Sequence, residues 1–104
     1  MSTALEQAFT ADLRRNLKAA AALGVAQKRL AADVERWGGV SCARELLRKN
    51  RLSEGFDALA AAGKLELSLE ALVVAGKYGA LFTDEEVNRC FGVLCDAGYY
   101  TWNA

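Results

Sequence analysis

The chain has 104 residues, of which 53% are hydrophobic and 25% are charged, and its formal net charge is zero. This length suits one domain, and the apolar content is too high for a disordered chain, which combines low hydrophobicity with high net charge. A membrane-spanning run of about 18 apolar residues is absent, and the first residues lack the basic and then apolar order of a secretory signal. We therefore expect one cytoplasmic domain over residues 1–104.

The first predicted helix covers about residues 4–23. Thr3 and Glu6 form a capping box, in which each side chain bonds the backbone N–H near the other residue. Apolar residues then recur every three or four positions, as expected for one helical stripe: Leu5, Phe9, Leu13, Leu17, Ala20 and Ala21. Gly24 is a natural C-terminal stop.

Two further helices are predicted between residues 25 and 50. The apolar residues Val25, Leu30, Val34 and Trp37 continue at helical spacing, which predicts a helix over about 26–37 that ends at the glycine pair 38–39. Ser41 is the predicted N-cap of the next helix. That helix runs to about Asn50, a residue that accepts the left-handed conformation.

The middle of the chain is punctuated by serine and glycine. Ser53 is predicted to cap a short helix that Gly63 ends. Apolar and polar residues alternate over 64–69, a strand-like pattern without a pairing partner, so we expect an extended link whose leucines fill the core. Ser68 then caps a helix that Gly76 ends.

The last third begins with an apolar turn, predicted from Tyr78, Leu81 and Phe82. Thr83 and Glu86 form a second capping box, which starts a helix that Gly98 ends. Residues 99–104 form an aromatic tail, which we expect to pack back onto the domain. These elements together predict an all-α fold, a compact single-domain bundle of five to six short helices.

A longer pattern extends over residues 38–99. Its parts are Gly38-Gly39, Ser53-Glu54-Gly55-Phe56, the run from Gly63 to Val73, the run from Leu81 to Glu86, and Ala97-Gly98-Tyr99. This pattern resembles a small, uncharacterised bacterial all-helical domain that occurs alone or joined to other modules. The resemblance implies an all-helical, bacterial, cytosolic protein, and it brings no activity with it.

The composition argues against catalysis. The chain has no histidine, which excludes Ser-His-Asp and Cys-His nucleophiles and histidine-ligated zinc. Phosphate-binding glycine loops and metal-binding motifs are also absent. The acidic pair Glu85 and Glu86 is explained by helix capping. We therefore expect no enzyme and no catalytic, cofactor-binding or metal-binding residues.

The three cysteines are Cys42, Cys90 and Cys95. An odd number without a CxxC pair argues against a disulfide framework and favours a reducing compartment. We interpret these residues as small hydrophobic side chains.

Charge is divided unevenly along the chain. Residues 1–51 carry a net charge of +5 and residues 52–104 carry −5. Arg44, Arg48 and Arg51 have the i, i+4, i+7 spacing of one helical face. The candidate partner-binding residues are Arg14, Arg15, Lys18, Arg44, Arg48, Lys49 and Arg51.

These observations favour a non-enzymatic protein-interaction domain, namely an inhibitor, immunity factor or adaptor in a bacterial or phage conflict. The alternative is a nucleic-acid-binding protein that uses the basic residues of the first half. A helix-turn-helix would need residues 37–41 as its turn, but its reading helix would lack an early Asn or Gln to recognise adenine. The divided charge is also compatible with a homodimer.

Overall fold

The computed structural model describes residues 3–99, and these residues are organised entirely by helices. The prediction of an all-α fold is confirmed. In chain order the elements are α1 (Ala4–Ala22), α2 (Lys28–Trp37), α3 (Gly39–Arg48), α4 (Phe56–Ala61), the 3₁₀ helix η1 (Leu65–Leu67), α5 (Leu69–Val74), the 3₁₀ helix η2 (Gly76–Leu81) and α6 (Asp84–Asp96).

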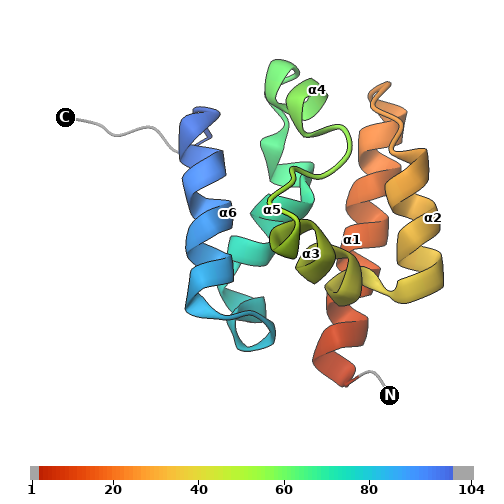
Figure 1. Ribbon diagram of the computed structural model, residues 1–104. Coiled ribbons are helices and arrows are strands. Elements are labelled where there is room, and N and C mark those ends of the chain that lie inside the picture. Colours follow the sequence, from red (N-terminus) through yellow and green to blue (C-terminus); the bar gives the residue numbers. More distant parts are fainter. Residues whose placement is uncertain (1–2, 100–104) are drawn as a thin grey trace.

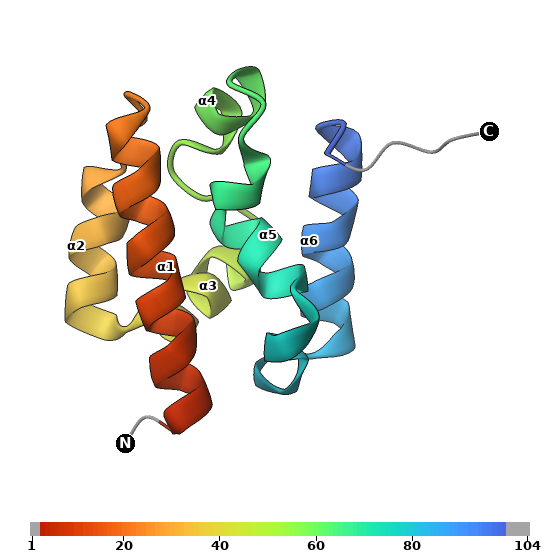
Figure 2. The ribbon, with the colours of Figure 1, turned by 180° about the vertical axis from the view of Figure 1, so that it is seen from behind.

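The helices are arranged around α5 and α3 (Figure 1). Helices α1 and α2 lie side by side on one flank, and α6 forms the opposite flank, where it packs on α5. Helix α3 crosses between the flanks and contacts α1 and α2, while α4 sits at one end of the bundle. The reverse view shows α1 and α5 in front of α3 (Figure 2).

The core consists of two groups of buried side chains. The larger group surrounds Phe9, whose ring packs edge to face against the rings of Tyr78 and Phe82, with ring centroids 5.2 and 5.3 Å apart. Edge-to-face packing is a favoured geometry for aromatic rings. The smaller group lies toward α4 and contains Ala20, Phe56, Leu59, Leu65 and Leu94. Every helix, η2 with Tyr78 included, therefore contributes at least one side chain to one of these two groups.

Local capping chemistry is found where the sequence predicts it. Both capping boxes are complete: Thr3 with Glu6 starts α1, and Thr83 with Glu86 starts α6. Ser68 caps α5 by accepting a hydrogen bond from a backbone N–H in the first turn. These bonds satisfy N–H groups that the first turn of a helix leaves without partners.

The predicted start of the third helix is wrong. Ser41 does not cap α3, because the helix begins two residues earlier, after Gly38 at φ 85° and ψ 157°. The backbone N–H of Gly39 instead donates to Thr10 Oγ1 of α1 at 2.9 Å. A Cβ atom on Gly39 would lie 3.0 Å from the Phe9 ring, so glycine permits the close approach of α3 to α1.

The predicted cap at Ser53 is also wrong. Helix α4 begins after Gly55, whose φ is 79°, and the Ser53 hydroxyl bonds Glu70 rather than the helix. The following link over 64–69 is a 3₁₀ turn rather than extended backbone. Its leucines do enter the core as predicted, since Leu65 and Leu69 are buried.

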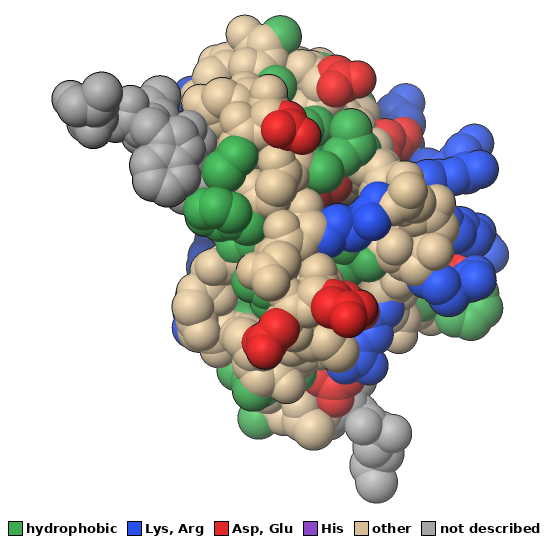
Figure 3. Space-filling view, turned by 60° about the vertical axis from the view of Figure 1, so that its left-hand side comes forward, with side chains coloured by type: hydrophobic (Ala, Val, Ile, Leu, Met, Phe, Trp, Pro, Cys, Tyr) green, Lys and Arg blue, Asp and Glu red, His purple; other side chains and the backbone are tan. Residues whose placement is uncertain are grey.

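Figure 3 shows the face that includes α6, where acidic side chains are scattered and basic side chains gather along one edge of the view. The predicted aromatic tail can be followed only at Tyr99, which is half-buried and packs on the smaller core group. Tyr100 and Trp102 lie outside the described residues.

Candidate functional site

The described surface is hollowed by a groove between α2 and α3, with the loop of residues 51–54 at one end. We call it the α2–α3 groove, and its volume is about 790 Å³. Its floor is apolar: Leu30 and Cys42 are buried and Leu46 is half-buried. The two helices that form its walls have ten residues each, or about 15 Å of length.

Two large apolar side chains remain uncovered at the rim of this groove. Trp37, at the end of α2, is 63% exposed, and Leu52, in the closing loop, is 44% exposed. The sequence pattern places Trp37 on the apolar stripe of its helix, and the structure leaves this end of the stripe uncovered. Leu30 and Val34 of that stripe are buried, whereas the Trp37 indole, at the last residue of α2, lies in solvent.

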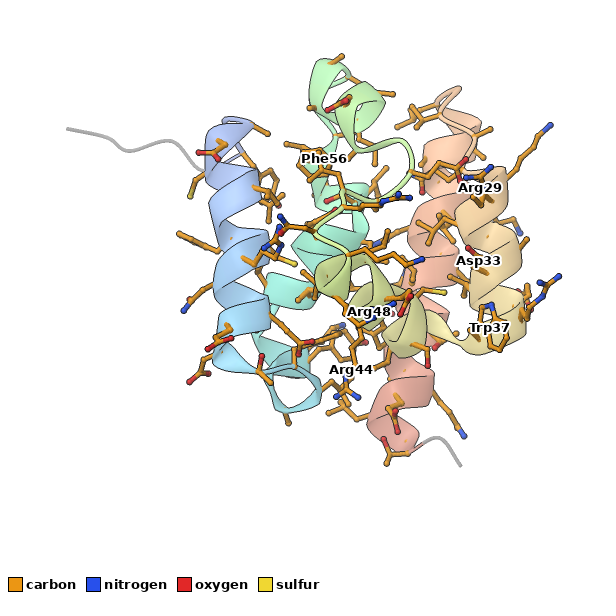
Figure 4. The ribbon with its side chains drawn as sticks, in the orientation of Figure 1. Arg29, Asp33, Trp37, Arg44, Arg48 and Phe56 are labelled. Atoms are coloured by element: carbon orange, nitrogen blue, oxygen red, sulfur yellow. The ribbon has the colours of Figure 1, made fainter. Side chains whose placement is uncertain are left out.

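Charged side chains with no ion-pair partner among residues 3–99 line the same groove. Arg29, Asp33 and Trp37 follow one another along α2 at intervals of four residues, on the side of the helix facing α3 (Figure 4). Arg29 and Asp33 form no ion pair within the described part of the chain, and neither does Arg51 of the closing loop.

The other charges of the groove are already engaged. Glu54 accepts a hydrogen bond from the Leu30 backbone N–H at 2.9 Å and so caps the start of α2. Glu45 accepts from Arg48 at 2.6 Å and lies 3.4 Å from the Lys49 ammonium. The side chains left for a ligand are therefore two arginines at the loop end and one carboxylate half-way along.

A buried bond holds the closing loop in position. Glu70 of α5 is only 4% exposed, and its two carboxylate oxygens accept from the Ser53 backbone N–H at 2.7 Å and from the Ser53 hydroxyl at 2.6 Å. Asn50, with φ 64°, turns the chain out of α3 just before the loop. These features fix the positions of Arg51 and Leu52 at the loop end of the α2–α3 groove.

The buried thiols are unreactive at neutral pH. Burial, with the nearby charge of Asp33, raises the pKa of Cys42 to about 11. Burial, with the charge of Glu70, raises the pKa of Cys90 to about 12. Both thiols are protonated at neutral pH, and a protonated thiol is neither a nucleophile nor a metal ligand. In the described residues, no three His, Cys, Asp or Glu side chains gather closely enough to hold a metal ion.

The predicted basic residues of α1 are separated from those of α3. Arg14 bonds Glu35 of α2 at 2.9 Å, and Arg15 bonds Asp12 within its own helix at 2.7 Å. Lys18 lines a second, shallower hollow of about 430 Å³ between α1 and α2. These residues therefore face α2 or their own helix, rather than joining one basic surface.

The predicted basic residues around α3 also have different roles. Arg44 donates to the Leu81 carbonyl oxygen at 2.6 Å, while Arg48 and Lys49 both pair with Glu45. The helix ends at Arg48, so Arg51 does not continue its face and lines the α2–α3 groove instead.

The groove residues Arg29, Asp33, Trp37 and Leu52 were not among the predicted site residues. The available signal was the four-residue spacing of Arg29, Asp33 and Trp37, which places them on one side of a helix. The turn between α2 and α3 is Gly38 alone, which is shorter than the three or four residues of a helix-turn-helix.

Comparison with known proteins gives no relative: no family model, curated protein or solved structure matches the chain. Among the described residues, none of the helices has the length and apolar character needed to cross a membrane.

Proposed function

We propose that this chain is a non-enzymatic protein-interaction domain that docks on a partner protein through the α2–α3 groove. The observation that carries the proposal is the pair of uncovered side chains, Trp37 and Leu52, above an apolar floor. Tryptophan is enriched at the centres of protein interfaces, where its burial contributes much of the binding energy. The charges without partners at the loop end add a means of orienting the partner.

The biological setting expected from the sequence remains part of this proposal. An inhibitor, immunity factor or adaptor acts by covering a surface of its target, and a small rigid bundle with a preformed groove suits such a role. The free thiols of Cys42, Cys90 and Cys95 support a cytoplasmic location.

Several of the basic residues on which a nucleic-acid-binding role would depend are engaged within the protein. Arg14, Arg15 and Arg48 are paired with carboxylates, and Arg44 bonds a backbone carbonyl. Neutralised side chains release fewer counterions on binding phosphates, so they contribute less affinity. This arrangement favours a protein partner over nucleic acid.

Affinity capture from the cells that produce the protein tests the proposal. The groove variant combines Trp37→Ala with Leu52→Ser, and the matched control is Leu23→Ser, which removes a leucine that is 52% exposed outside the groove. A second variant, Arg44→Glu with Arg48→Glu, reverses charges outside the groove. Circular dichroism first establishes that all variants are folded.

We expect one protein to be captured by the wild type, the control and the charge variant, and to be lost with the groove variant. The same pattern must then hold in titrations with that partner after purification. Capture that survives the groove variant but is abolished by the charge variant or by nuclease treatment contradicts the proposal and favours nucleic acid. Capture of only a second copy of this chain also contradicts it.

A further inference from the structure

The geometry of the α2–α3 groove points to one kind of partner: we infer that it binds an amphipathic α-helix with two apolar anchors about two turns apart and carboxylates beside only one of them. This inference rests on the proposed function and specifies the partner of the same site.

The first step concerns the secondary structure of the partner. Residues 3–99 contain no strand, so this part of the chain offers no sheet edge on which an extended peptide could pair its backbone. A helix satisfies its own backbone hydrogen bonds and needs only side-chain contacts from a groove. Helix α2 is about 15 Å long, so about three turns of a partner helix fit along it.

The second step concerns the spacing of the apolar anchors. Leu52 belongs to the loop in which Glu54 caps the first turn of α2, whereas Trp37 is the last residue of that helix. The two uncovered side chains therefore mark opposite ends of the groove. Arg29 and Trp37 are eight residues apart on α2, which corresponds to about 12 Å along the helix axis. Anchors at positions i and i+7 or i+8 of the partner helix span this distance.

The third step concerns charge. Arg29 and Arg51 stand at the Leu52 end without carboxylate partners among the described residues, and Asp33 lies half-way to Trp37. Guanidinium groups bind carboxylates through paired, charge-assisted hydrogen bonds. The partner therefore places Asp or Glu beside the anchor that meets Leu52. It avoids an acid at the middle position, where Asp33 would repel it.

A phage-displayed library of helical peptides tests this inference. The peptides have about 16 residues, enough to exceed the length of the groove. Selection uses the wild-type protein, after removal of clones that bind the Trp37→Ala, Leu52→Ser variant. We expect the selected peptides to carry two apolar residues seven or eight positions apart, with Asp or Glu enriched beside one of them.

A charge-reversal variant then tests the role of the arginines. Arg29→Glu with Arg51→Glu is compared with Lys28→Glu plus Arg36→Glu, which makes the same change in net charge with side chains that do not line the groove. In fluorescence anisotropy we expect the first variant to weaken binding of the selected acidic peptides by at least about tenfold, or roughly 1.4 kcal/mol. The second variant should stay within about threefold of the wild type.

Each result decides between the inference and the proposed function. Selected peptides without acidic enrichment, or equal weakening by both charge variants, contradict the inference, while a native partner lost with the groove variant would still support the proposed function. If no selected peptide requires Trp37 and Leu52 for binding, the result contradicts both the inference and the proposed function. Sedimentation velocity adds one further outcome: a dimer of the wild type that the groove variant abolishes would make a second copy the occupant and overturn the inference.

Discussion

The hydrogen bonds between Ser53 and Glu70 are expected to be among the most important polar contacts for stability. A buried carboxylate receives both of its bonds here from one residue, through the backbone N–H and the hydroxyl. Substitution Ser53→Ala keeps the backbone bond and removes the hydroxyl bond at 2.6 Å. Because Glu70 is 4% exposed, water cannot readily replace the lost donor.

The expected cost follows from the charge of the acceptor. A hydrogen bond to a charged group contributes about 1.5–3 kcal/mol, and we expect Ser53→Ala to reduce the free energy of unfolding by about 2 kcal/mol. With an unfolding entropy of about 2.1 cal/mol/K per residue, this corresponds to a fall in Tm of roughly 9 °C for a chain of this size. Urea unfolding and thermal unfolding followed by circular dichroism measure both quantities.

Ser41→Ala is the matched control. The sequence pattern predicts Ser41 as a helix cap, and loss of such a cap would cost about 1 kcal/mol. In the structure Ser41 is exposed and lies inside the first turn of α3, so its substitution should change stability by less than about 0.5 kcal/mol. Equal effects of the two substitutions, or a larger effect at Ser41, would refute the reasoning.

Three other predictions concern side chains away from the loop. Hydrogen bonds from Tyr78 and Lys77 lower the pKa of Asp12 in the folded protein, so as the pH falls this carboxylate takes up its proton in the unfolded chain first. The free energy of unfolding should therefore decrease as the pH drops below about 4. The variant Asp12→Asn should show a smaller decrease in urea unfolding measured at several pH values. Thr10→Val removes the acceptor for the Gly39 N–H while keeping the shape, and should cost about 1 kcal/mol in urea unfolding; an unchanged midpoint would contradict this long-range cap. The buried thiols of Cys42 and Cys90, with pKa values of about 11 and 12, should react with a thiol reagent at pH 7.5 only as fast as the protein unfolds. The half-buried thiol of Cys95 should react first. Equal reaction rates of the three thiols would show that Cys42 and Cys90 are not buried.

Features governed by neighbouring residues could be predicted from the sequence. The capping boxes at Thr3 and Thr83 and the cap at Ser68 each join groups three residues apart, so a short pattern contains the whole interaction. The left-handed conformation of Asn50 also depends only on local preference. The all-α fold follows from many such local choices that agree with one another.

Features that depend on distant partners could not be predicted in this way. Ser53 bonds Glu70, 17 residues away, and the start of α3 is capped by Thr10, 29 residues away from Gly39. Helical spacing placed Trp37 on an apolar stripe, but only the packing of α3 decides how far along α2 that stripe is covered. The groove brings together two helices and a loop, so no single segment of the sequence reveals it.

The exposure of the Trp37 indole in the complex tests the central claim most directly. A Trp102→Phe variant leaves Trp37 as the single tryptophan, and acrylamide quenching of its fluorescence can be followed while the purified partner is added. The free indole is 63% exposed, so docking in the α2–α3 groove predicts a saturable blue shift and a clear loss of quenching. Emission and quenching that stay unchanged at full occupancy of the partner would contradict the claim.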